Sequence, residues 1–348
     1  MSKDKWIFDS REVENELPHP PQRLLDGAVM VKHNPVREVF FHNGYFIKRD
    51  SRKNHTFAKE FAAAQKLRRR KIAVVEHLAH GKCEDGNYLI TRGVNSAVTV
   101  EDHLFEHPVS EKFTAELIDF LRQWKRSGFF HTDAHLGNIL YVPEKSEFTL
   151  VDVRGVRRKL LWESLPFCCP ADVMRFIFNL RGHVTFAKIE ELFSMFNCRH
   201  PRHILQEMLK AESARLLKEW DKRKRQLFNA YPKFSCQNGK SLVAAQYKDN
   251  YTMFPAEDSE NAGAEFAASF FLTLFQIPHR RVCAVDLEKN QVRRAPELQG
   301  TPGTENIHEA AMPLDMCGLS HETSDWRCFR GMAALNDLNN IIRARMFQ

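Results

Sequence analysis

The sequence predicts an α+β protein with two lobes, a small β-rich N-lobe and a helical C-lobe, followed by an extra C-terminal segment. Two patterns predict this division: β-prone runs surround an Asn-Gly turn early in the chain, and long helical periodicities begin near residue 109. The length of 348 residues, with 43% hydrophobic content, exceeds one compact core of typical size. The expected units are an N-terminal extension at 1–29, the N-lobe at 30–92, the C-lobe at 93–230 and the C-terminal segment at 231–348.

The N-lobe is expected to hold a β-hairpin and then a helix. Two β-prone runs flank Asn43-Gly44, a dipeptide that favours a tight hairpin turn. Lys48 falls on the second strand of this hairpin. Apolar residues then recur at helical spacing over 57–70, and Glu60 lies in the first turns of this predicted helix.

The next segments predict a buried strand, a linker and a long helix. The strand is expected at 88–91 and the linker between the lobes at 92–96. Backbone groups of such a linker would pair with an adenine base, so Thr91 and Gly93 are candidate nucleotide-binding residues. Helical periodicity predicts a helix over 109–127, and we interpret its apolar stripe as core.

The most informative segment is HTDAHLGN at 131–138, followed by DVR at 152–154. Apolar β-formers flank both motifs, so two strands would deliver Asp133 and Asp152 to one end of a hairpin. Phosphoryl transfer needs a carboxylate that orients the acceptor hydroxyl and oxygen ligands that hold Mg²⁺ against the nucleotide phosphates. The step from Asp133 to Asn138 equals the spacing in the catalytic loop of protein kinases. We therefore predict Asp133 as the catalytic carboxylate and Asn138 and Asp152 as metal ligands; the alternative is that they stabilise a tight turn.

A centre of this kind also needs an upstream lysine that holds the α- and β-phosphates and a helix glutamate that fixes this lysine. Lys48 and Glu60 precede the predicted catalytic loop in that order, although either alone would be taken as an ordinary surface charge. No G-x-G-x-x-G motif precedes Lys48, where only Gly27 and Gly44 are found. Phosphate cover is therefore expected from the hairpin backbone, from Lys48 and from Mg²⁺.

Six motifs together resemble a known family. They are Lys48, AKEF at 58–61, NYLITR at 87–92, AVTVED at 97–102, the His-x-Asp-x-His-x-x-Asn pattern at 131–138 and DVR at 152–154. Over about residues 30–185, the chain that contains them resembles the Kdo/heptose lipopolysaccharide core kinase family. The resemblance implies a bilobal protein-kinase-like fold and phosphorylation of a lipopolysaccharide inner-core sugar from ATP.

The same resemblance implies roles for single residues. Asp133 is the catalytic carboxylate, Asn138 and Asp152 hold the metal, and Lys48 with Glu60 forms the nucleotide-side ion pair. The DVR motif stands where protein kinases carry Asp-Phe-Gly, which favours this atypical branch over protein kinases. The His-x-Asp pattern also occurs in aminoglycoside- and choline-type phosphotransferases, so it indicates the superfamily rather than the substrate.

Signals of location and redox state are few. No stretch approaches the roughly 18 to 20 apolar residues that cross a bilayer, and residues 1–21 lack a signal-peptide core. A cytoplasmic location is therefore expected. The eight cysteines, with Cys168 and Cys169 adjacent, show no disulfide framework and are expected to stay reduced. Cys198-x-His200-x-x-His203 is a single half-site, and no zinc is expected there.

The formal net charge is +7, and Lys and Arg gather at 68–71, 154–159 and 218–225. A basic surface suits acidic partners such as anionic lipid head groups and phosphorylated sugars. An apolar stripe shares the region 205–220, so peripheral contact with the anionic inner-membrane surface is an expectation, and a solvated helix face is the alternative. Nucleic acid is not expected as a partner, because no binding module or helix-turn-helix signature appears.

The C-terminal part of the chain carries one internal similarity. EFAA at 265–268 repeats EFAA at 60–63, and Lys248 lies upstream as Lys48 does. A degenerate N-lobe-like repeat within 231–348 is one interpretation, and coincidence is the other. The remaining expectations are helix over 166–226, a flexible linker over 293–313 and a closing helix over 333–345.

The sequence thus predicts an ATP- and Mg²⁺-dependent kinase whose favoured acceptor is a sugar hydroxyl of the lipopolysaccharide core. Two rivals stay open. One is a kinase of another acceptor, such as a protein, choline or an aminoglycoside. The other is a pseudokinase that binds nucleotide or lipid as a scaffold. The missing glycine loop favours the scaffold, and the presence of Lys48, Asp133, Asn138 and Asp152 opposes it.

Overall fold

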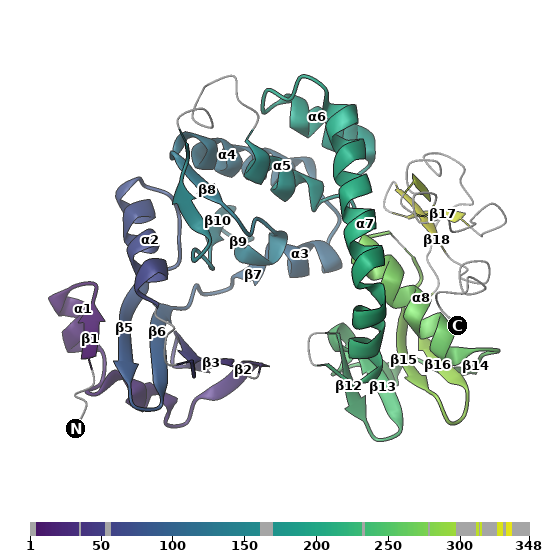
Figure 1. The fold of residues 1–348 in the computed structure, drawn as a ribbon, viewed down its shortest axis with the longest axis horizontal. Coiled ribbons are helices and arrows are strands. Elements are labelled where there is room, and N and C mark those ends of the chain that lie inside the picture. The colour runs from purple at the N-terminus through teal and green to yellow at the C-terminus, as the bar shows by residue number, and fades with distance from the viewer. Residues whose placement is uncertain are drawn as a thin grey trace. The chain divides into compact units, whose positions relative to one another are not determined.

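The chain forms two compact units, residues 1–176 and residues 177–348, in the computed structural model. Figure 1 shows their helices and strands. The structure describes residues 5–34, 36–52, 57–160, 170–231, 234–277, 279–296, 311–312, 314, 326–329 and 332–335. None of the helices in these ranges combines the length and the apolar character needed to cross a bilayer.

The first unit opens with a six-stranded antiparallel sheet. Its strands are β1 (Lys5–Phe8), β2 (Val29–Asn34), β3 (Arg37–His42), β4 (Tyr45–Asp50), β5 (His77–Cys83) and β6 (Gly86–Arg92). Their order across the sheet is β1-β5-β6-β4-β3-β2. Helix α2 (Ala58–Arg69) connects β4 to β5, so the strand that bears Lys48 is followed by a helix, as in the small lobe of protein kinases. The predicted β-rich N-lobe is confirmed.

The Asn43-Gly44 turn forms as the sequence predicts. Both residues have positive φ angles, 45° and 83°, which a tight turn between β3 and β4 requires. The turn sets the register of the hairpin, so that Lys48 lies opposite Val39 on one side and Leu89 on the other. Lys48 therefore sits in the interior of the sheet.

The segment that precedes the hairpin packs onto the same sheet. Strand β1 pairs with β5, and α1 (Arg11–Glu16) buries Val13 against the sheet. A short 3-10 helix, η1 (Pro21–Leu25), leads into β2. A Cβ atom at Gly81 of β5 would lie 2.4 Å from the Trp6 ring, so a glycine is required for β1 to lie this close.

The rest of the first unit is mainly helical, with short strands around its loops. Its elements are β7 (Val98–Thr99), α3 (Val100–Glu106), α4 (Glu111–Arg126), β8 (Phe129–His131), η2 (Leu136–Asn138), β9 (Ile139–Val142), β10 (Glu147–Leu150), β11 (Val156–Arg158) and the start of α5 (Ala171–Phe178). The strands form two small sheets, β10-β9-β7 and β11-β8. The apolar stripe predicted as core is buried on α4: Phe113, Leu117, Phe120, Leu121 and Trp124.

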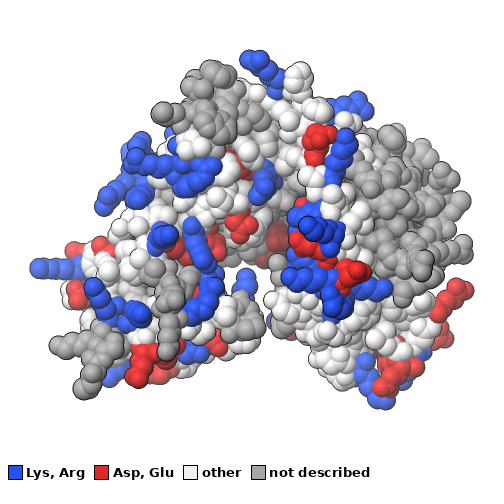
Figure 2. Space-filling view, viewed as in Figure 1, with Lys and Arg blue, Asp and Glu red and all other residues white. Residues whose placement is uncertain are grey.

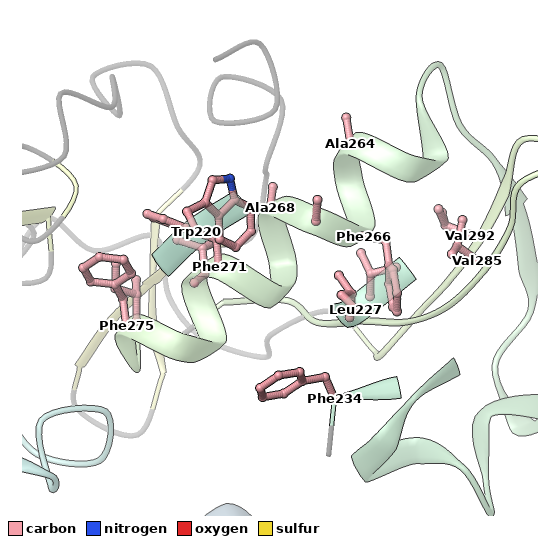
Figure 3. Packing of buried hydrophobic residues seen from close by; sticks show 14 of the residues in the cluster. Trp220, Leu227, Phe234, Ala264, Phe266, Ala268, Phe271, Phe275, Val285 and Val292 are labelled. Carbon is pink, nitrogen blue, oxygen red and sulfur yellow. The ribbon is translucent and has the colours of Figure 1, made fainter. Parts of the chain in front are cut away.

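The second unit combines several helices with a second antiparallel sheet. Its elements are α6 (Phe186–Ser194), α7 (Pro201–Phe228), β12 (Ser235–Asn238), β13 (Ser241–Ala244), η4 (Ala245–Tyr247), η5 (Tyr251–Met253), β14 (Ala256–Asp258), α8 (Ala262–Phe275), β15 (Val282–Asp286), β16 (Gln291–Arg294), β17 (Trp326–Phe329) and β18 (Met332–Leu335). The five-stranded sheet has the order β12-β13-β15-β16-β14. Figure 3 shows the core, in which Phe271 of α8 meets Trp220 of α7 edge to face at 5.0 Å.

Three expectations for this half of the chain have different outcomes. Helix over 166–226 is confirmed in α5, α6 and α7, while 161–169, with Cys168 and Cys169, lies outside the described residues. The closing helix predicted from residue 333 is wrong where the structure describes it, because Met332–Leu335 pairs with β17. A short apolar run fits either helix or strand, and its pairing partner decides. The linker predicted from residue 293 starts later, since β16 extends to Arg294.

The internal similarity around EFAA does not place Lys248 where Lys48 lies. Lys248 does not lie on a strand but ends the short 3-10 helix η4, and its side chain is 64% exposed. Glu265 of the repeated EFAA segment is paired instead with Arg294 of β16. The sequence similarity therefore does not extend to the ion pair.

Candidate active site

The predicted catalytic loop begins at the end of β8, where a buried carboxylate holds it. Asp172 of α5 is 1% exposed. Its Oδ2 accepts hydrogen bonds from the backbone N of His131 at 3.0 Å and from Trp124 Nε1 at 2.7 Å. Asp172 thereby fixes the point at which the loop leaves β8. Sequence reasoning placed Asp172 in a helix and missed this role, because its partners lie 41 and 48 residues away along the chain.

The His131 ring joins the two loops of the site. The backbone N of Asp133 donates to His131 Nδ1 at 3.2 Å, so Nδ1 is the acceptor nitrogen and Nε2 carries the hydrogen. Nε2 donates to the carbonyl oxygen of Asp152 at 2.8 Å. Burial lowers the pKa of His131, although the Asp152 carbonyl and nearby carboxylates act in the other direction, and this favours the neutral ring. The ring therefore couples the position of Asp133 to that of Asp152.

The two predicted metal ligands lie on adjoining backbone. Asn138 is buried, and its Nδ2 donates to the carbonyl oxygen of Asp133 at 3.0 Å, which turns its Oδ1 the other way. The backbone N of Val151, next to Asp152, donates to the Asn138 carbonyl at 3.1 Å. The Asp152 Oδ1 accepts from the backbone N of Arg154 at 3.2 Å. An amide oxygen and a carboxylate are thus brought together by the backbone of the two loops.

A glycine sets the separation of these loops. The backbone N and the Oγ1 of Thr132 both lie 3.0 Å from the carbonyl oxygen of Gly155 and donate to it. A Cβ atom at position 155 would lie 2.5 Å from Thr132 Oγ1. A larger residue would push the two loops apart, and Asp133 would move with Thr132.

Lys48 and Glu60 form an ion pair inside the N-lobe. The Lys48 Nζ lies 2.6 Å from the Glu60 Oε1, and the two side chains are 17% and 2% exposed. Burial acts to raise the pKa of Glu60, but the Lys48 ammonium and the His77 ring more than offset this and lower it to about 2. The carboxylate therefore stays charged, and α2 is held to β4. Lysine has three N–H donors, of which this contact needs one.

The two predicted base-binding residues lie at the end of β6. Thr91 is 4% exposed and pairs with Phe46 and His77 on the neighbouring strands. The backbone N of Gly93 donates to the carbonyl oxygen of Gly44 at 2.7 Å. The Asn43-Gly44 turn therefore anchors the linker, and this N–H is engaged within the lobe. Contact between Gly93 and an adenine base stays a prediction. Because the N–H of Gly93 is engaged, that prediction concerns the carbonyl oxygen of Gly93.

Backbone hydrogen bonds connect the segment after α2 with the strand that leads to Asp152. The backbone N of Val75 donates to Leu150 O at 2.9 Å, and the backbone N of Leu150 donates to Ala73 O at 3.1 Å. Helix α2 also contacts β11. The element that carries Glu60 and the loop that carries Asp152 are therefore neighbours within the first unit.

A chain of charges, which sequence reasoning missed, runs from the N-terminal segment to the linker. Asp9 accepts from Arg68 of α2 at 2.7 Å, and Arg68 lies 3.8 Å from Glu76. Glu76 accepts from Arg92 at 2.7 Å, and Arg92 makes two bonds of 2.8 Å to Glu16 of α1. The bonds from Arg92 lower the pKa of Glu16. No local sequence pattern predicts this network, because most of its partners are far apart in sequence.

The sheet order, the lysine–glutamate pair beside α2 and the two loops around His131 define the class of the protein, which is a protein-kinase-like fold. No protein-family model matches the chain, and no curated protein matches it. The roles of Lys48, Glu60, Asp133, Asn138 and Asp152 stay predictions.

Solved structures show a partial likeness. WbdD, described as a bifunctional kinase-methyltransferase, is 16% identical over 50% of this chain and 47% of its own, with a TM-score of 0.34. WbdD with a kinase inhibitor is 18% identical over 49% of this chain and 41% of its own, with a TM-score of 0.33. Vaccinia related kinase 3 is 16% identical over 45% of this chain and 49% of its own, with a TM-score of 0.29. The chain thus spans less than half the length of each, and we draw nothing about activity from these scores.

Proposed function

We propose that the protein is an ATP- and Mg²⁺-dependent kinase whose acceptor is a sugar hydroxyl of the lipopolysaccharide inner core. The observation that best supports kinase activity is the Lys48–Glu60 ion pair, whose carboxylate is buried. In kinases a strand lysine held by a helix glutamate binds the nucleotide phosphates, and both must be in place for transfer. The loops joined by His131 supply the remaining groups of the site.

The residues present fit ATP and Mg²⁺. Asn138 and Asp152 offer an amide oxygen and a carboxylate, which are the hard donors that Mg²⁺ prefers. Their backbones are tied by the bond from Val151 to Asn138. Lys48 would hold the α- and β-phosphates with the N–H groups that Glu60 does not use. When bound, Mg²⁺ supplies neutralisation of the charge on the phosphates.

Asp133 is the residue that would act on the acceptor. Its side chain is 73% exposed, so an acceptor hydroxyl can reach it, and its backbone is fixed by His131 and Asn138. Asp133 would orient the hydroxyl and take its proton while the bond from the acceptor oxygen to the γ-phosphorus forms and the bond to ADP breaks. His135 Nε2 lies 3.8 Å from the Asp133 carboxylate and adds a polar neighbour on the open side.

The sugar acceptor is supported by the motifs that resemble lipopolysaccharide core kinases and by basic residues beside the catalytic loop. Arg157 lies over the Phe130 ring at 4.2 Å, and Arg175 donates to the Thr132 carbonyl at 3.3 Å. Guanidinium groups in these positions suit the anionic groups of an inner-core acceptor. A protein, choline or an aminoglycoside is the alternative acceptor.

Contact with the anionic inner-membrane surface, from a cytoplasmic location, is part of the proposal. Figure 2 shows Lys and Arg side chains interleaved with acidic ones over α7. Glu219 pairs with Arg223 at 2.8 Å, while Lys218 and Lys222 are exposed. Sedimentation with vesicles that contain an anionic phospholipid, compared with zwitterionic vesicles, tests this partner. Lys218→Glu with Lys222→Glu should release the protein, and equal recovery with both vesicle types would remove the membrane from the proposal.

The decisive experiment for the activity is transfer of γ-phosphate from radiolabelled ATP to purified lipopolysaccharide core. We expect transfer by the wild type with Mg²⁺, none after chelation and none by Asp133→Ala. Transfer to protein, choline or an aminoglycoside in place of the core would correct the acceptor. Binding of ATP without transfer to any of these would favour the pseudokinase, which the missing glycine-rich loop also favours.

A further inference from the structure

One buried polar atom beside the Lys48–Glu60 pair has no part in the proposed mechanism. His77 opens β5, and its side chain is 1% exposed. Its Nε2 is one of a few buried side-chain atoms in the described part of the chain that have no hydrogen-bond partner. A buried polar atom without a partner costs free energy, so its retention requires a physical reason.

The other ring nitrogen limits the protonation states of His77. Its Nδ1 lies 2.9 Å from the carbonyl oxygen of Val75. A carbonyl oxygen only accepts, so Nδ1 carries a hydrogen. Nε2 then bears a lone pair in the neutral ring or a second hydrogen in the cationic ring.

Nε2 faces the carboxylate that holds Lys48. It lies 3.7 Å from the Glu60 Oε1, the same oxygen that accepts the 2.6 Å bond from Lys48. In the neutral ring a lone pair would face a charged oxygen at a buried site, where repulsion is weakly screened. In the cationic ring an N–H faces that oxygen, and a small rotation of either side chain completes a charge-assisted hydrogen bond. The cationic ring is therefore the form that can donate to Glu60.

The charged groups next to His77 come from two neighbouring elements. Glu60 belongs to α2, and Lys48 to β4. On β5 itself, the His80 ring lies at a tilt against Phe61 of α2, with 4.9 Å between the ring centroids, and burial lowers the pKa of His80. Glu76, the preceding residue, is engaged by Arg92 in the chain of charges. Glu60 and Lys48 are therefore the charges nearest to His77, and they act on its ring in opposite directions.

We propose that His77 is a positioning residue whose cationic ring holds Glu60 while Lys48 turns toward the nucleotide phosphates. This inference rests on the proposed function, because it gives the Lys48–Glu60 pair its nucleotide-side role. A second cation on the same oxygen keeps Glu60 charged and α2 in place when Lys48 shares its hydrogens with the phosphates. Loss of the proton from His77 removes this support. Nucleotide affinity therefore falls as the pH rises and the ring gives up this proton.

The first test measures the Kd of MgATP from acidic to alkaline pH for the wild type, His77→Leu and His77→Gln. The wild-type Kd should rise about tenfold from the acidic to the alkaline limit, the size of one hydrogen bond to a charged group. His77→Leu should bind weakly at every pH. His77→Gln, whose amide donates at every pH, should bind more tightly than His77→Leu and show the same flat profile.

His80→Leu is the matched control, since it changes the other histidine of β5 and should keep the wild-type profile. Thermal unfolding establishes that each variant is folded. A folded His77→Leu protein with the wild-type Kd and the wild-type pH profile would overturn the inference.

A second measurement separates this inference from the proposed function. The His77 ring is titrated by NMR in the wild type and in Glu60→Gln, without nucleotide. We expect the ring of Glu60→Gln to lose its proton at a lower pH, since the carboxylate stabilises the cation. An unchanged midpoint overturns the inference even if MgATP binds. A shifted midpoint in a protein that binds no MgATP supports the contact between His77 and Glu60 and rejects the nucleotide role.

Discussion

Helices α2 and α8 carry the same four residues, EFAA, yet their glutamates are paired in different ways. In the first unit, Glu60 accepts from Lys48 of the preceding strand, β4, at 2.6 Å. In the second unit, Glu265 accepts from Arg294 of β16 through both of its oxygens, at 2.6 and 2.8 Å. The sequence similarity lies in the helices, and the difference lies in the strand that supplies the cation.

The sheets explain why the partners differ. Each unit contains a run of three strands, a helix and two more strands in chain order: β2, β3, β4, α2, β5 and β6 in the first, and β12, β13, β14, α8, β15 and β16 in the second. The strand before the helix is central in the first sheet, where β4 lies between β3 and β6, but β14 lies at the edge of the second sheet. Because β4 is central, its Lys48 can lie beneath helix α2. Because β14 is at the edge, the cation beneath helix α8 comes from the neighbouring strand, β16.

The two cations also differ in what they leave available. Arg294 donates to Glu257 as well, and Ser259 donates to Glu265, so the charges of the second pair are fully engaged. A guanidinium keeps its charge and fixes a carboxylate at two points, which suits a structural clamp. Lys48 is a compact charge with donors to spare, which suits a ligand site.

The largest expected effect is on the rate of phosphate transfer and comes from a change in the first unit alone. Asp133→Asn should lower phosphate transfer by about 10²- to 10⁴-fold, the usual contribution of a general base. Its stability should stay within about 0.5 kcal/mol of the wild type, because the side chain is 73% exposed. Transfer assays and urea unfolding measure the two quantities. Asp119→Asn, at another exposed aspartate, is the control and should keep full transfer.

The next effect compares the two ion pairs directly. Lys48→Met and Arg294→Met each remove the lysine or arginine that pairs with a buried glutamate, so both should lower the free energy of unfolding by about 3 kcal/mol. Only Lys48→Met should lose transfer, by roughly 100- to 1,000-fold, because only that cation would act on charge in the transition state. Melting curves and transfer rates are recorded for both. Loss of transfer in a folded Arg294→Met protein would show that the second unit takes part in catalysis.

Acid should weaken the first pair in a defined pH window. The pKa of Glu60 is about 2 in the fold, below the value of about 4.3 for an unfolded chain. A carboxyl group whose pKa is lower in the fold than in the unfolded chain stabilises the fold at pH values above its unfolded pKa. The contribution of Glu60, on the order of 3 kcal/mol, is therefore lost as the pH falls from about 4 to 2. Acid unfolding followed by circular dichroism should show a shallower loss for Glu60→Gln than for the wild type. Parallel curves would mean that Glu60 is not the group that titrates.

The smallest effect concerns surface charges in each unit. Glu16→Gln removes one member of the chain of charges and should cost about 0.5 kcal/mol at low salt, and less at high salt. Glu288→Gln breaks the isolated, exposed pair with Lys240 and should cost almost nothing. Thermal melts at two salt concentrations distinguish the two. Equal shifts in both variants would mean that the chain of charges acts as separate pairs.

Local patterns were sufficient to predict much of the first unit. The Asn43-Gly44 turn specifies a register, and that register puts Lys48 inside the sheet. The apolar spacing over 57–70 specifies the helix face that buries Glu60. Each of these features depends on residues a few positions apart, which is the range over which spacing carries information.

The contacts that sequence reasoning missed join distant parts of the chain. Asp172 holds His131 from 41 residues away, and Asp9 meets Arg68 across 59 residues. Such pairs depend on how elements pack, and no periodicity records this. The similarity around EFAA has the same limit, because a lysine upstream of that segment does not determine which strand lies beneath the helix.

The attachment of the N-terminal sheet to β10 restricts how the first unit can move. One attachment is the linker, where Gly93 is bonded to Gly44; the other is the backbone contact of Ala73 and Val75 with Leu150. A body held at a single point can swing in any direction, whereas a body held at two points can turn only about the line that joins them. Any opening and closing of the sheet over a bound nucleotide would then be a rotation with one degree of freedom. Lys48 would then move along the same arc at each closure, because the second attachment prevents the sideways movement that a single flexible joint allows.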